Sequence, residues 1–161
     1  MDRLFSPWRY QYVSTSAPSS GCVFCSAESS SDEDALIVHR ARLSYVIVNR
    51  YPYTSGHLMV VPFRHAATLH ECTVEEAREL MDLTRAGEQV LQDVYRAPGI
   101  NIGMNVGACA GAGVAGHLHM HLLPRWPGDA NFLSTVGETR VLPEDLGQTW
   151  TKLRAAWPAS C

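Results

Sequence analysis

Three histidines in the segment 116–125 constrain the fold and the chemistry of this chain more than any other feature. The segment reads GHLHMHLLPR, so His117, His119 and His121 alternate with large apolar residues. Successive side chains of a β-strand point to opposite faces. A strand here would therefore align the three imidazoles on one face and bury the apolar residues between them in a core.

Strand geometry limits what the three histidines can do together. Neighbouring residues on one face are about 6.6 Å apart, so the first and third imidazoles would be attached roughly 13 Å apart. Bonds from zinc to a histidine nitrogen are only about 2.0–2.1 Å long, so one ion cannot easily reach all three rings. We therefore favour a division of labour among the histidines over a single metal centre. The alternative is an ordinary strand whose polar face carries solvated histidines.

The hydrophobic pattern of the chain predicts an α+β domain. Thr73 and Glu76 form a capping box at the start of a long helix, which has to end before Pro98. A C-terminal helix is expected between Pro143 and Trp157. Because these helices do not alternate regularly with strands, we expect an antiparallel sheet of about five strands. The other strands, besides the histidine segment, are predicted at 35–38, 43–48, 57–62 and 100–106.

The 161 residues correspond to one domain, 1–161. We expect an aromatic-rich N-terminal arm at 1–20, a core at 22–132 and a C-terminal extension with its helix at 133–161. Within the core, the polar, acidic stretch 26–34 is predicted to be mobile.

Charge and hydropathy exclude two classes of partner. The net charge is −3 and no long basic run offsets it, which argues against nucleic acid. No apolar run approaches the roughly 18 residues that span a bilayer, and the N-terminal residues contain no signal-peptide core. We therefore predict a cytoplasmic protein without a membrane partner.

Two further segments have compositions that suggest binding. Cys22 and Cys25 have the spacing of a metal knuckle, although two ordinary thiols remain an equal alternative. The segment 107–116 consists almost entirely of Gly, Ala, Val and Cys, so its backbone amides could approach and cradle phosphate oxygens.

The motif His-φ-His-φ-His-φ-φ over 117–123, with φ apolar, resembles the signature of the histidine triad superfamily. Residues 49–62, 105–107 and 124–125 resemble the family's other segments in the right order, so the resemblance covers about 22–132. Further features resemble the bacterial diadenosine tetraphosphate phosphorylase branch of the superfamily. They are PWRY at 7–10, AGAG at 110–113 and RW followed by GDANF within 125–132.

The resemblance implies nucleotidyl transfer through a covalent nucleotidyl-histidine. His119 would be the nucleophile, with the proton on its other nitrogen held by a carbonyl or a side chain. His121 would contact phosphate oxygens and move a proton, while His57 would orient a triad histidine. Backbone amides of Gly113, Val114 and Ala115 would stabilise charge in the transition state.

The resemblance also implies nucleotide contacts. Asn49 would hold the ribose, although a turn-forming role is equally common for such a residue. Asn105 would lie near the phosphates, and Phe24 and Ile47 would sandwich the base. Many hydrolases of the superfamily carry Gln-Ser or Gln-Thr where this chain has Gly113 and Val114. Inorganic phosphate, rather than water, is therefore a possible acceptor.

Zinc-containing members of the superfamily complete Cys-x-x-Cys with two histidines. In this chain the four ligands would be Cys22, Cys25, His65 and His117, a closed tetrahedral set typical of structural zinc.

The expected substrate is an adenine nucleotide or dinucleoside polyphosphate, and the expected assembly is a homodimer or a higher homo-oligomer. Two alternative functions remain open. The first is hydrolysis of nucleoside phosphoramidates or aminoacyl-adenylates, and the second is a nucleotide-binding regulatory protein with low turnover.

Overall fold

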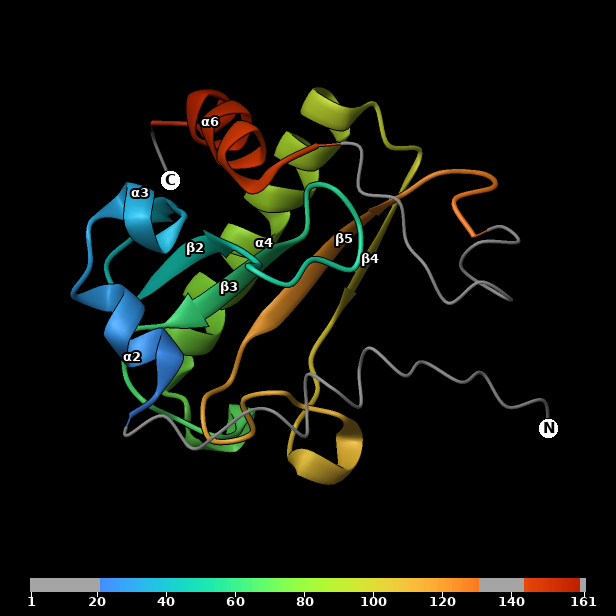
Figure 1. Cartoon of the computed structure of the whole chain (residues 1–161). Coiled ribbons are helices and arrows are strands. Elements are labelled where there is room, and N and C mark those ends of the chain that lie inside the picture. The colour runs from blue at the N-terminus through green and yellow to red at the C-terminus, as the bar shows by residue number, and fades with distance from the viewer. Residues whose placement is uncertain (1–20, 131–143, 160–161) are drawn as a thin grey trace, which may run out of the picture.

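A five-stranded antiparallel sheet forms the centre of the protein (Figure 1). The structure is a computed structural model, and it describes residues 21–130 and 144–159. The strand order is β1-β2-β3-β5-β4, which confirms the predicted α+β fold. The strands are β1 (Ile37–Arg40), β2 (Ser44–Val48), β3 (Leu58–Pro62), β4 (Gly99–Gly103) and β5 (Met120–Arg125). The helices are α2 (Val23–Glu28), α3 (Asp32–Ala35), α4 (Val74–Tyr95) and α6 (Leu146–Ala156), with short 3-10 turns at Leu69–Glu71 and Ala108–Ala110.

The central strands β2 and β3 are buried on both faces, and their alternating side chains separate two cores. On one face Val46, Val48, Leu58 and Val60 pack with residues of α4 and α6. On the other face the side chains include Tyr45, Ile47, Met59 and Val61, and they pack with Phe24 of α2. The larger helices therefore cover one face, which leaves the opposite face for the site described below (Figure 1).

Helix α4 begins and ends where its local signals indicate. The Thr73 side chain accepts the amide of Glu76, and the Glu76 side chain accepts the amide of Thr73, so the predicted capping box is present. The apolar stripe of α4 buries Leu80, Leu83, Val90 and Leu91. The helix ends at Tyr95, and its C-cap Arg96 adopts a left-handed conformation with φ 51° two residues before Pro98.

Helix α6 lies against α4 and the edge strand β1. The Asp145 side chain caps its first turn through the amide of Gln148. Leu153 is fully buried, and Trp150 donates its indole N–H to the carbonyl of Ile37 at 2.8 Å. The C-terminal helix predicted between Pro143 and Trp157 is therefore present, starting three residues later.

Three local predictions were wrong. The stretch 26–34 contributes to α2 and α3 instead of forming a mobile loop, because the Arg40 guanidinium binds the Asp32 carboxylate and the carbonyls of Glu28 and Ser30. The strand expected at 35–38 starts only at Ile37, after α3 has ended. The strand expected at 100–106 spans only Gly99–Gly103, at the edge of the sheet, and its Ile102 is 43% exposed.

The histidine segment also differs from the prediction. Only His121 lies within a strand, since β5 begins at Met120. His117 and His119 precede it in irregular backbone, where the amide of Leu118 donates to the carbonyl of Ala66 at 2.7 Å.

The arm at 1–20 and the segment 131–143 lie outside the described residues, including PWRY and the last two residues of GDANF. Among the helices that the structure does describe, none has both the length and the apolar character needed to cross a bilayer.

Candidate active site and metal centre

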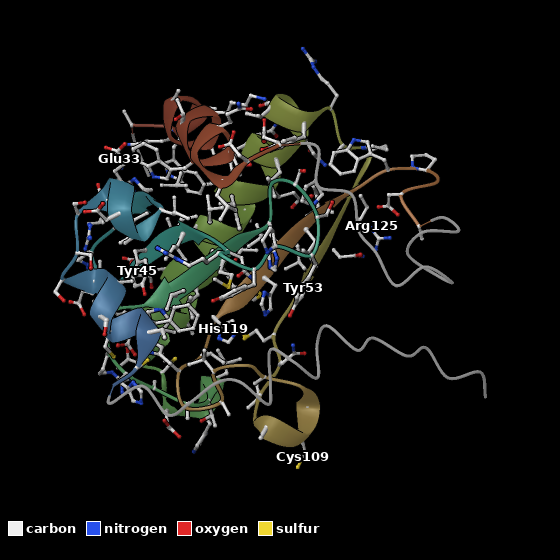
Figure 2. All side chains as sticks on the ribbon, viewed as in Figure 1. Glu33, Tyr45, Tyr53, Cys109, His119 and Arg125 are labelled. Carbon is white, nitrogen blue, oxygen red and sulfur yellow. The ribbon has the colours of Figure 1, made fainter. Side chains whose placement is uncertain are left out.

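Four histidines meet at the sheet face opposite α4. His121 lies on β5, with Met59 of β3 and Gly103 of β4 as its register partners. His57 directly precedes β3, and His119 directly precedes β5. All three side chains are buried, as is that of His117. Figure 2 labels His119 and Tyr53 in the view onto the sheet.

His119 is held with one ring nitrogen protonated and the other available. Its Nδ1 lies 2.8 Å from the carbonyl oxygen of His117, and because a carbonyl only accepts, Nδ1 carries the proton. The Nε2 of the neutral ring therefore keeps its lone pair. Burial lowers the pKa of His119 below its usual value, partly offset by this hydrogen bond. The ring is thus a neutral imidazole, the form that acts as a nucleophile.

A chain of hydrogen bonds places the proton of His121 on Nε2, whereas that of His119 is on Nδ1. The amide of Tyr53 donates to His57 Nδ1 at 3.1 Å, so the proton of a neutral His57 is on Nε2. That Nε2 lies 2.9 Å from Nδ1 of His121, which must accept. His121 consequently carries its own proton on Nε2. Burial, and secondarily the nearby His119, lower the pKa of His121 to about 4, so the ring is neutral at physiological pH.

Tyr53 was not predicted as part of the site. Its ring centroid lies 4.7 Å from that of His57 and 5.8 Å from that of His121, so the ring covers the histidine pair. The turn-rich composition of 49–56 predicted a loop before His57. No sequence signal indicated that the loop's amide and aromatic ring would both reach the histidines.

The predicted nucleotide contacts lie at different distances from the histidines. Phe24 packs against His119 with 4.9 Å between ring centroids, and Ile47 belongs to the same apolar cluster. The Asn49 side chain accepts the amide of Tyr51 and places its Nδ2 3.2 Å from His57 Nδ1. Asn105 is half-buried two residues beyond the end of β4. The turn-forming role of Asn49 is therefore present alongside its position next to His57.

The glycine-rich segment forms a compact turn before the histidines. Gly107 and Gly111 have φ values of 84° and 88°, a region that side chains with a Cβ rarely adopt. Val114 packs against the apolar cluster that contains Phe24, and its carbonyl accepts the amide of His117. Gly113, Val114 and Ala115 are thereby brought to the end of the sheet at which His117 lies.

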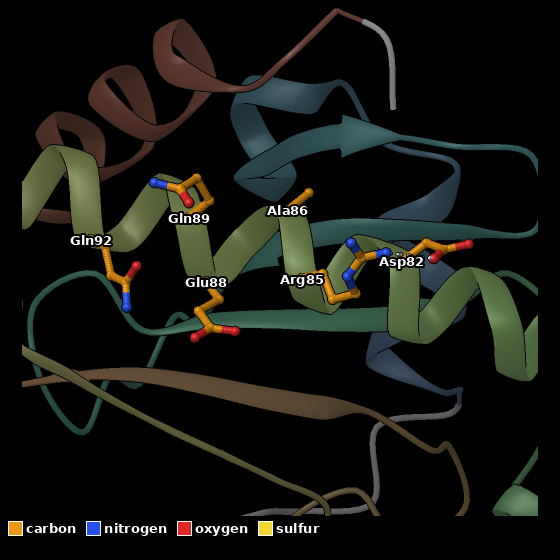
Figure 3. Close-up of a pocket in the computed structure, with 6 residues that line it drawn as sticks. All are labelled: Asp82, Arg85, Ala86, Glu88, Gln89 and Gln92. Carbon is orange, nitrogen blue, oxygen red and sulfur yellow. Dashed lines mark ion pairs between the residues drawn. The ribbon is translucent and has the colours of Figure 1, made fainter.

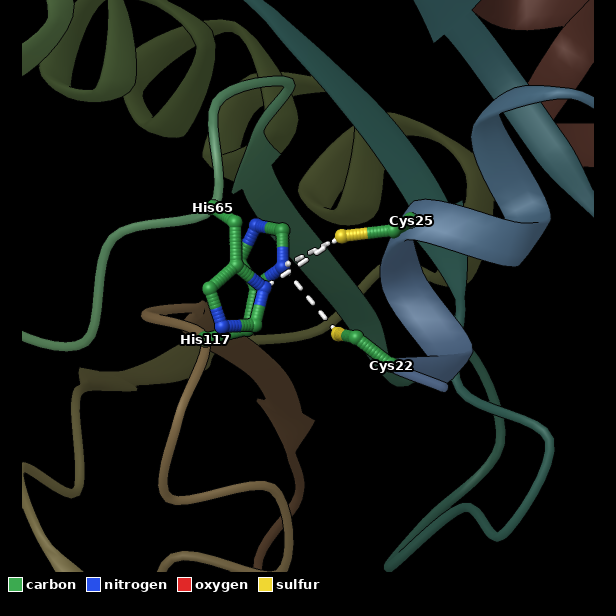
Figure 4. A group of neighbouring side chains, drawn as sticks. All are labelled: Cys22, Cys25, His65 and His117. Atoms are coloured by element: carbon green, nitrogen blue, oxygen red, sulfur yellow. Dashed lines mark hydrogen bonds between the residues drawn. The ribbon is translucent and has the colours of Figure 1, made fainter. Parts of the chain in front are cut away.

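Cys22, Cys25, His65 and His117 converge from three separate parts of the chain (Figure 4). Cys22 Sγ lies 3.3 Å from His117 Nδ1, and Cys25 Sγ lies 3.3 Å from His65 Nδ1 and 3.6 Å from His117 Nδ1. Ligand atoms around a tetrahedral zinc ion, with bonds of about 2.0–2.3 Å, are about 3.3–3.8 Å apart. Three donor pairs therefore already have tetrahedral spacing, and all four donor atoms lie within 4.8 Å of one another, so the four side chains could hold one ion.

His117 is oriented for this cluster by the backbone. Its Nε2–H donates to the carbonyl of Pro62 at 2.9 Å, which leaves the Nδ1 lone pair directed at the two thiols. His117 thus offers its ring to a metal and its carbonyl to His119. The main chain of His117 therefore orients the His119 ring through this hydrogen bond.

A separate shallow groove lies on the outer surface of α4 (Figure 3). It has a volume of about 520 Å³, and it is lined by Asp82, Arg85, Ala86, Glu88, Gln89 and Gln92. All of its lining residues come from one helix, and none is a histidine or cysteine. The groove therefore lacks the chemistry of the histidine site.

The fold and the histidine site define a histidine triad protein, and the chain belongs to the HIT domain family. The sequence model of the HIT domain matches residues 30–128, so the predicted membership is confirmed. The chain is 39% identical to a protein of Mycobacterium tuberculosis named AP-4-A phosphorylase, over 98% of this chain and 85% of that protein. It is also 36% identical to the asymmetrical bis(5'-nucleosyl)-tetraphosphatase of Schizosaccharomyces pombe, over 58% and 50% of the two chains.

Solved structures agree with this membership. A Zn-bound histidine triad family protein from Mycobacterium smegmatis has a TM-score of 0.70 and 25% identity, and the match covers 85% of this chain and 93% of that one. A hypothetical histidine triad nucleotide-binding protein from Sulfolobus tokodaii has a TM-score of 0.68 and 25% identity, with 84% and 91% covered.

Proposed function

We propose that this protein is an enzyme that cleaves dinucleoside polyphosphates through a covalent nucleotidyl-histidine on His119. The observation that carries the proposal is the pairing of two differently protonated imidazoles. His119 presents a free Nε2 lone pair, and His121 carries a proton on its Nε2. Their ring centroids are 4.8 Å apart, so both can reach one phosphate group. The names of the M. tuberculosis and S. pombe relatives support the same substrate class.

Two displacements at one phosphorus make up the reaction. His119 Nε2 attacks the α-phosphorus, forming an N–P bond as the P–O bond to the leaving polyphosphate breaks. The Nε2–H of His121 donates to a phosphate oxygen where negative charge accumulates. An acceptor oxygen then attacks the same phosphorus and breaks the N–P bond, which restores the imidazole. His57 acts on the reaction only by orienting His121.

Inorganic phosphate is our proposed acceptor. The support is the apolar Gly113-Val114 pair, where many hydrolases of the superfamily carry polar residues, together with the phosphorylase name of the M. tuberculosis relative. With phosphate as acceptor, diadenosine tetraphosphate yields ADP and ATP. With water it would yield AMP and ATP.

Product analysis tests the acceptor and the substrate class together. Purified protein is incubated with diadenosine tetraphosphate, with and without inorganic phosphate, and the nucleotides are separated by ion-exchange chromatography. We expect ADP and ATP in equal amounts only when phosphate is present. AMP and ATP in both reactions would refute phosphorolysis but keep dinucleoside cleavage. No turnover in either reaction, with turnover of an adenosine phosphoramidate, would favour the alternative hydrolase, and turnover of neither substrate would favour a regulatory nucleotide-binding protein.

The substrate contacts follow from the same proposal. Phe24 and Ile47 would enclose the base, and Asn49 would hold the ribose. Asn105 would lie near the phosphates, and the amides of Gly113, Val114 and Ala115 would donate to them. The position of Phe24 against His119 supports this placement, because it brings an aromatic ring next to the nucleophile.

We assign the four-residue cluster to a structural zinc ion. Two cysteine and two histidine donors are a ligand set typical of zinc, and all four protein positions are used, so no position remains for water. Such an ion would join α2 to the segment before β5 without taking part in the displacements.

A homodimer joined along β4 is the assembly that we propose. β4 is the edge strand of the described sheet, and its residues 101–103 are exposed, with Ile102 at 43%. Light scattering during gel filtration would give the mass, and a monomer would refute the proposal. The single-domain organisation of residues 1–161 and the cytoplasmic location remain predictions of the sequence.

A further inference from the structure

The metal cluster and the nucleophile share two physical connections. Cys22 and Cys25 flank Phe24, whose ring centroid lies 4.9 Å from that of His119 and 5.5 Å from that of His117. The carbonyl of His117, whose ring belongs to the cluster, accepts the Nδ1–H of His119. An ion that holds these four side chains in place would therefore also hold the Phe24 ring against His119 and the His117 carbonyl at the Nδ1–H of His119.

Helix α2, which carries this connection, depends on other parts of the chain for its position. It has six residues and its N-cap Cys22 makes no side-chain cap bond, whereas isolated helices shorter than about 12 residues are marginal in water. One anchor is Phe24, which is 5% exposed in the apolar cluster and whose carbonyl accepts the Tyr45 hydroxyl at 2.9 Å. The second anchor is the pair of thiols facing His65 and His117. An ion bound by all four donor atoms would hold α2 against His65 and His117 more strongly than the thiol contacts do alone.

We propose that metal binding and nucleotide binding are coupled through Phe24, so that occupancy of either site raises the affinity of the other. The inference rests on the proposed function, which places the base of the nucleotide against Phe24. An ion that joins α2 to His65 and His117 holds the Phe24 ring in the position that the base requires. A nucleotide that packs on Phe24 in turn holds Cys22 and Cys25 toward the histidines. By thermodynamic linkage the two effects are the same factor.

Reciprocal affinity measurements on the full chain test this coupling without any turnover. Chelator competition gives the zinc affinity with and without saturating AMP, and calorimetric titration gives the AMP affinity with and without zinc. We expect each ligand to tighten the other by about 5-fold or more, and by equal factors, within the range typical of coupled sites.

Two variants locate the coupling. Phe24→Leu keeps an apolar side chain but removes the ring, and it should reduce the factor toward one. Ile37→Val removes one methyl group from the same apolar cluster and should leave the factor unchanged. Circular dichroism confirms that each zinc-loaded variant is folded. If Phe24→Leu does not fold, Phe24→Met takes its place.

Three results would overturn the inference. They are equal zinc affinities with and without AMP, full coupling in the folded Phe24 variant, and absence of AMP binding to the zinc-loaded protein. The product assay with diadenosine tetraphosphate is a separate measurement. Cleavage without coupling would refute only the coupling, and coupling without cleavage would refute only the proposed reaction.

Discussion

At the scale of single residues, the direction of each hydrogen bond leaves a different ring nitrogen free in chemically identical histidines. His119 donates through Nδ1, and His117 donates through Nε2, so their free nitrogens differ. His121 accepts at Nδ1 from His57. Backbone carbonyls and one backbone amide, rather than charged partners, set these tautomers. Burial favours the neutral rings of His119 and His121, and the hydrogen bonds leave free the nitrogens that the proposed nucleophile, proton donor and metal ligand require.

The first prediction concerns the nucleophile. His119→Asn retains an amide that can donate to the His117 carbonyl but has no nucleophilic nitrogen. We expect turnover of diadenosine tetraphosphate to fall by about 10⁴-fold or more, because the covalent route is lost. AMP binding, measured by calorimetry, should change little. His70→Asn, at an exposed position, is the matched control, and retention of turnover in His119→Asn would refute the assignment.

The second prediction concerns acid stability. The pKa of His121 is lowered to about 4 in the folded protein, against about 6.5 in the unfolded chain. Between these values only the unfolded chain binds the proton, so the free energy of unfolding falls as pH decreases from 6.5 to 4. The difference of about 2.5 pH units corresponds to a loss of about 3 kcal/mol at most.

Urea denaturation between pH 7 and pH 4 measures this loss. His121→Asn keeps an oxygen that can accept from His57 but does not titrate, so its free energy of unfolding should depend less steeply on pH than that of the wild type. His70→Asn, at an exposed position, is measured beside it as the matched histidine-to-asparagine control. Identical slopes for the wild type and His121→Asn would show that His121 titrates normally.

The sequence predicted the histidines of the candidate site more readily than the groups that contact them. Alternation of His117, His119 and His121 predicted a site, and the family resemblance added His57 and His65 to it. Tyr53 and the Pro62 carbonyl could not be predicted, because backbone groups and covering rings leave no residue-type pattern. The contacts of the Tyr53 ring and the Pro62 carbonyl depend on the backbone conformation around each residue, which is set only when the chain folds.

At the scale of elements, local signals predicted the helices better than the strands. The capping box at Thr73 and the proline at position 98 predicted both ends of α4 to within a few residues. The strand predicted over the histidine segment begins only at Met120, because alternation alone does not show where a strand loses its hydrogen-bonded partner. Pro62 has no N–H, and its carbonyl accepts the His117 ring, so β3 pairs with β5 only through Leu58, Met59 and Val60.

The third prediction belongs to α4. Thr73→Ala removes the side-chain oxygen that accepts the Glu76 amide, and we expect the free energy of unfolding to fall by about 1 kcal/mol. Thr73→Ser retains that oxygen and should stay near the wild type. Urea denaturation of the three proteins compares them. Equal stability of the Ala and Ser variants would mean that the cap contributes nothing measurable.

At the scale of the whole molecule, the cluster of Cys22, Cys25, His65 and His117 brings together segments up to 95 residues apart in the chain. A metal ion bound there would therefore stabilise the fold.

The fourth prediction is that a chelator lowers the melting temperature and that added zinc restores it. Zinc at 100 times its dissociation constant would contribute about 2.7 kcal/mol, or about 5–10 °C. Differential scanning calorimetry measures the shift. Cys22→Ser should melt at the lower temperature with or without zinc, and a wild-type melting temperature insensitive to chelator would contradict a structural ion.

The contacts of α6 also bear on how the sheet can extend. Trp150 and Arg154 both donate to the Ile37 carbonyl, so side chains of α6 occupy the outermost strand at the β1 end. At the other end, β4 is the exposed edge of the described structure. Exposed edges invite pairing with another chain. Since side chains of α6 already occupy the Ile37 carbonyl at the β1 end, we expect edge pairing between two copies to use β4, which would give a pair about a twofold axis rather than a growing fibre.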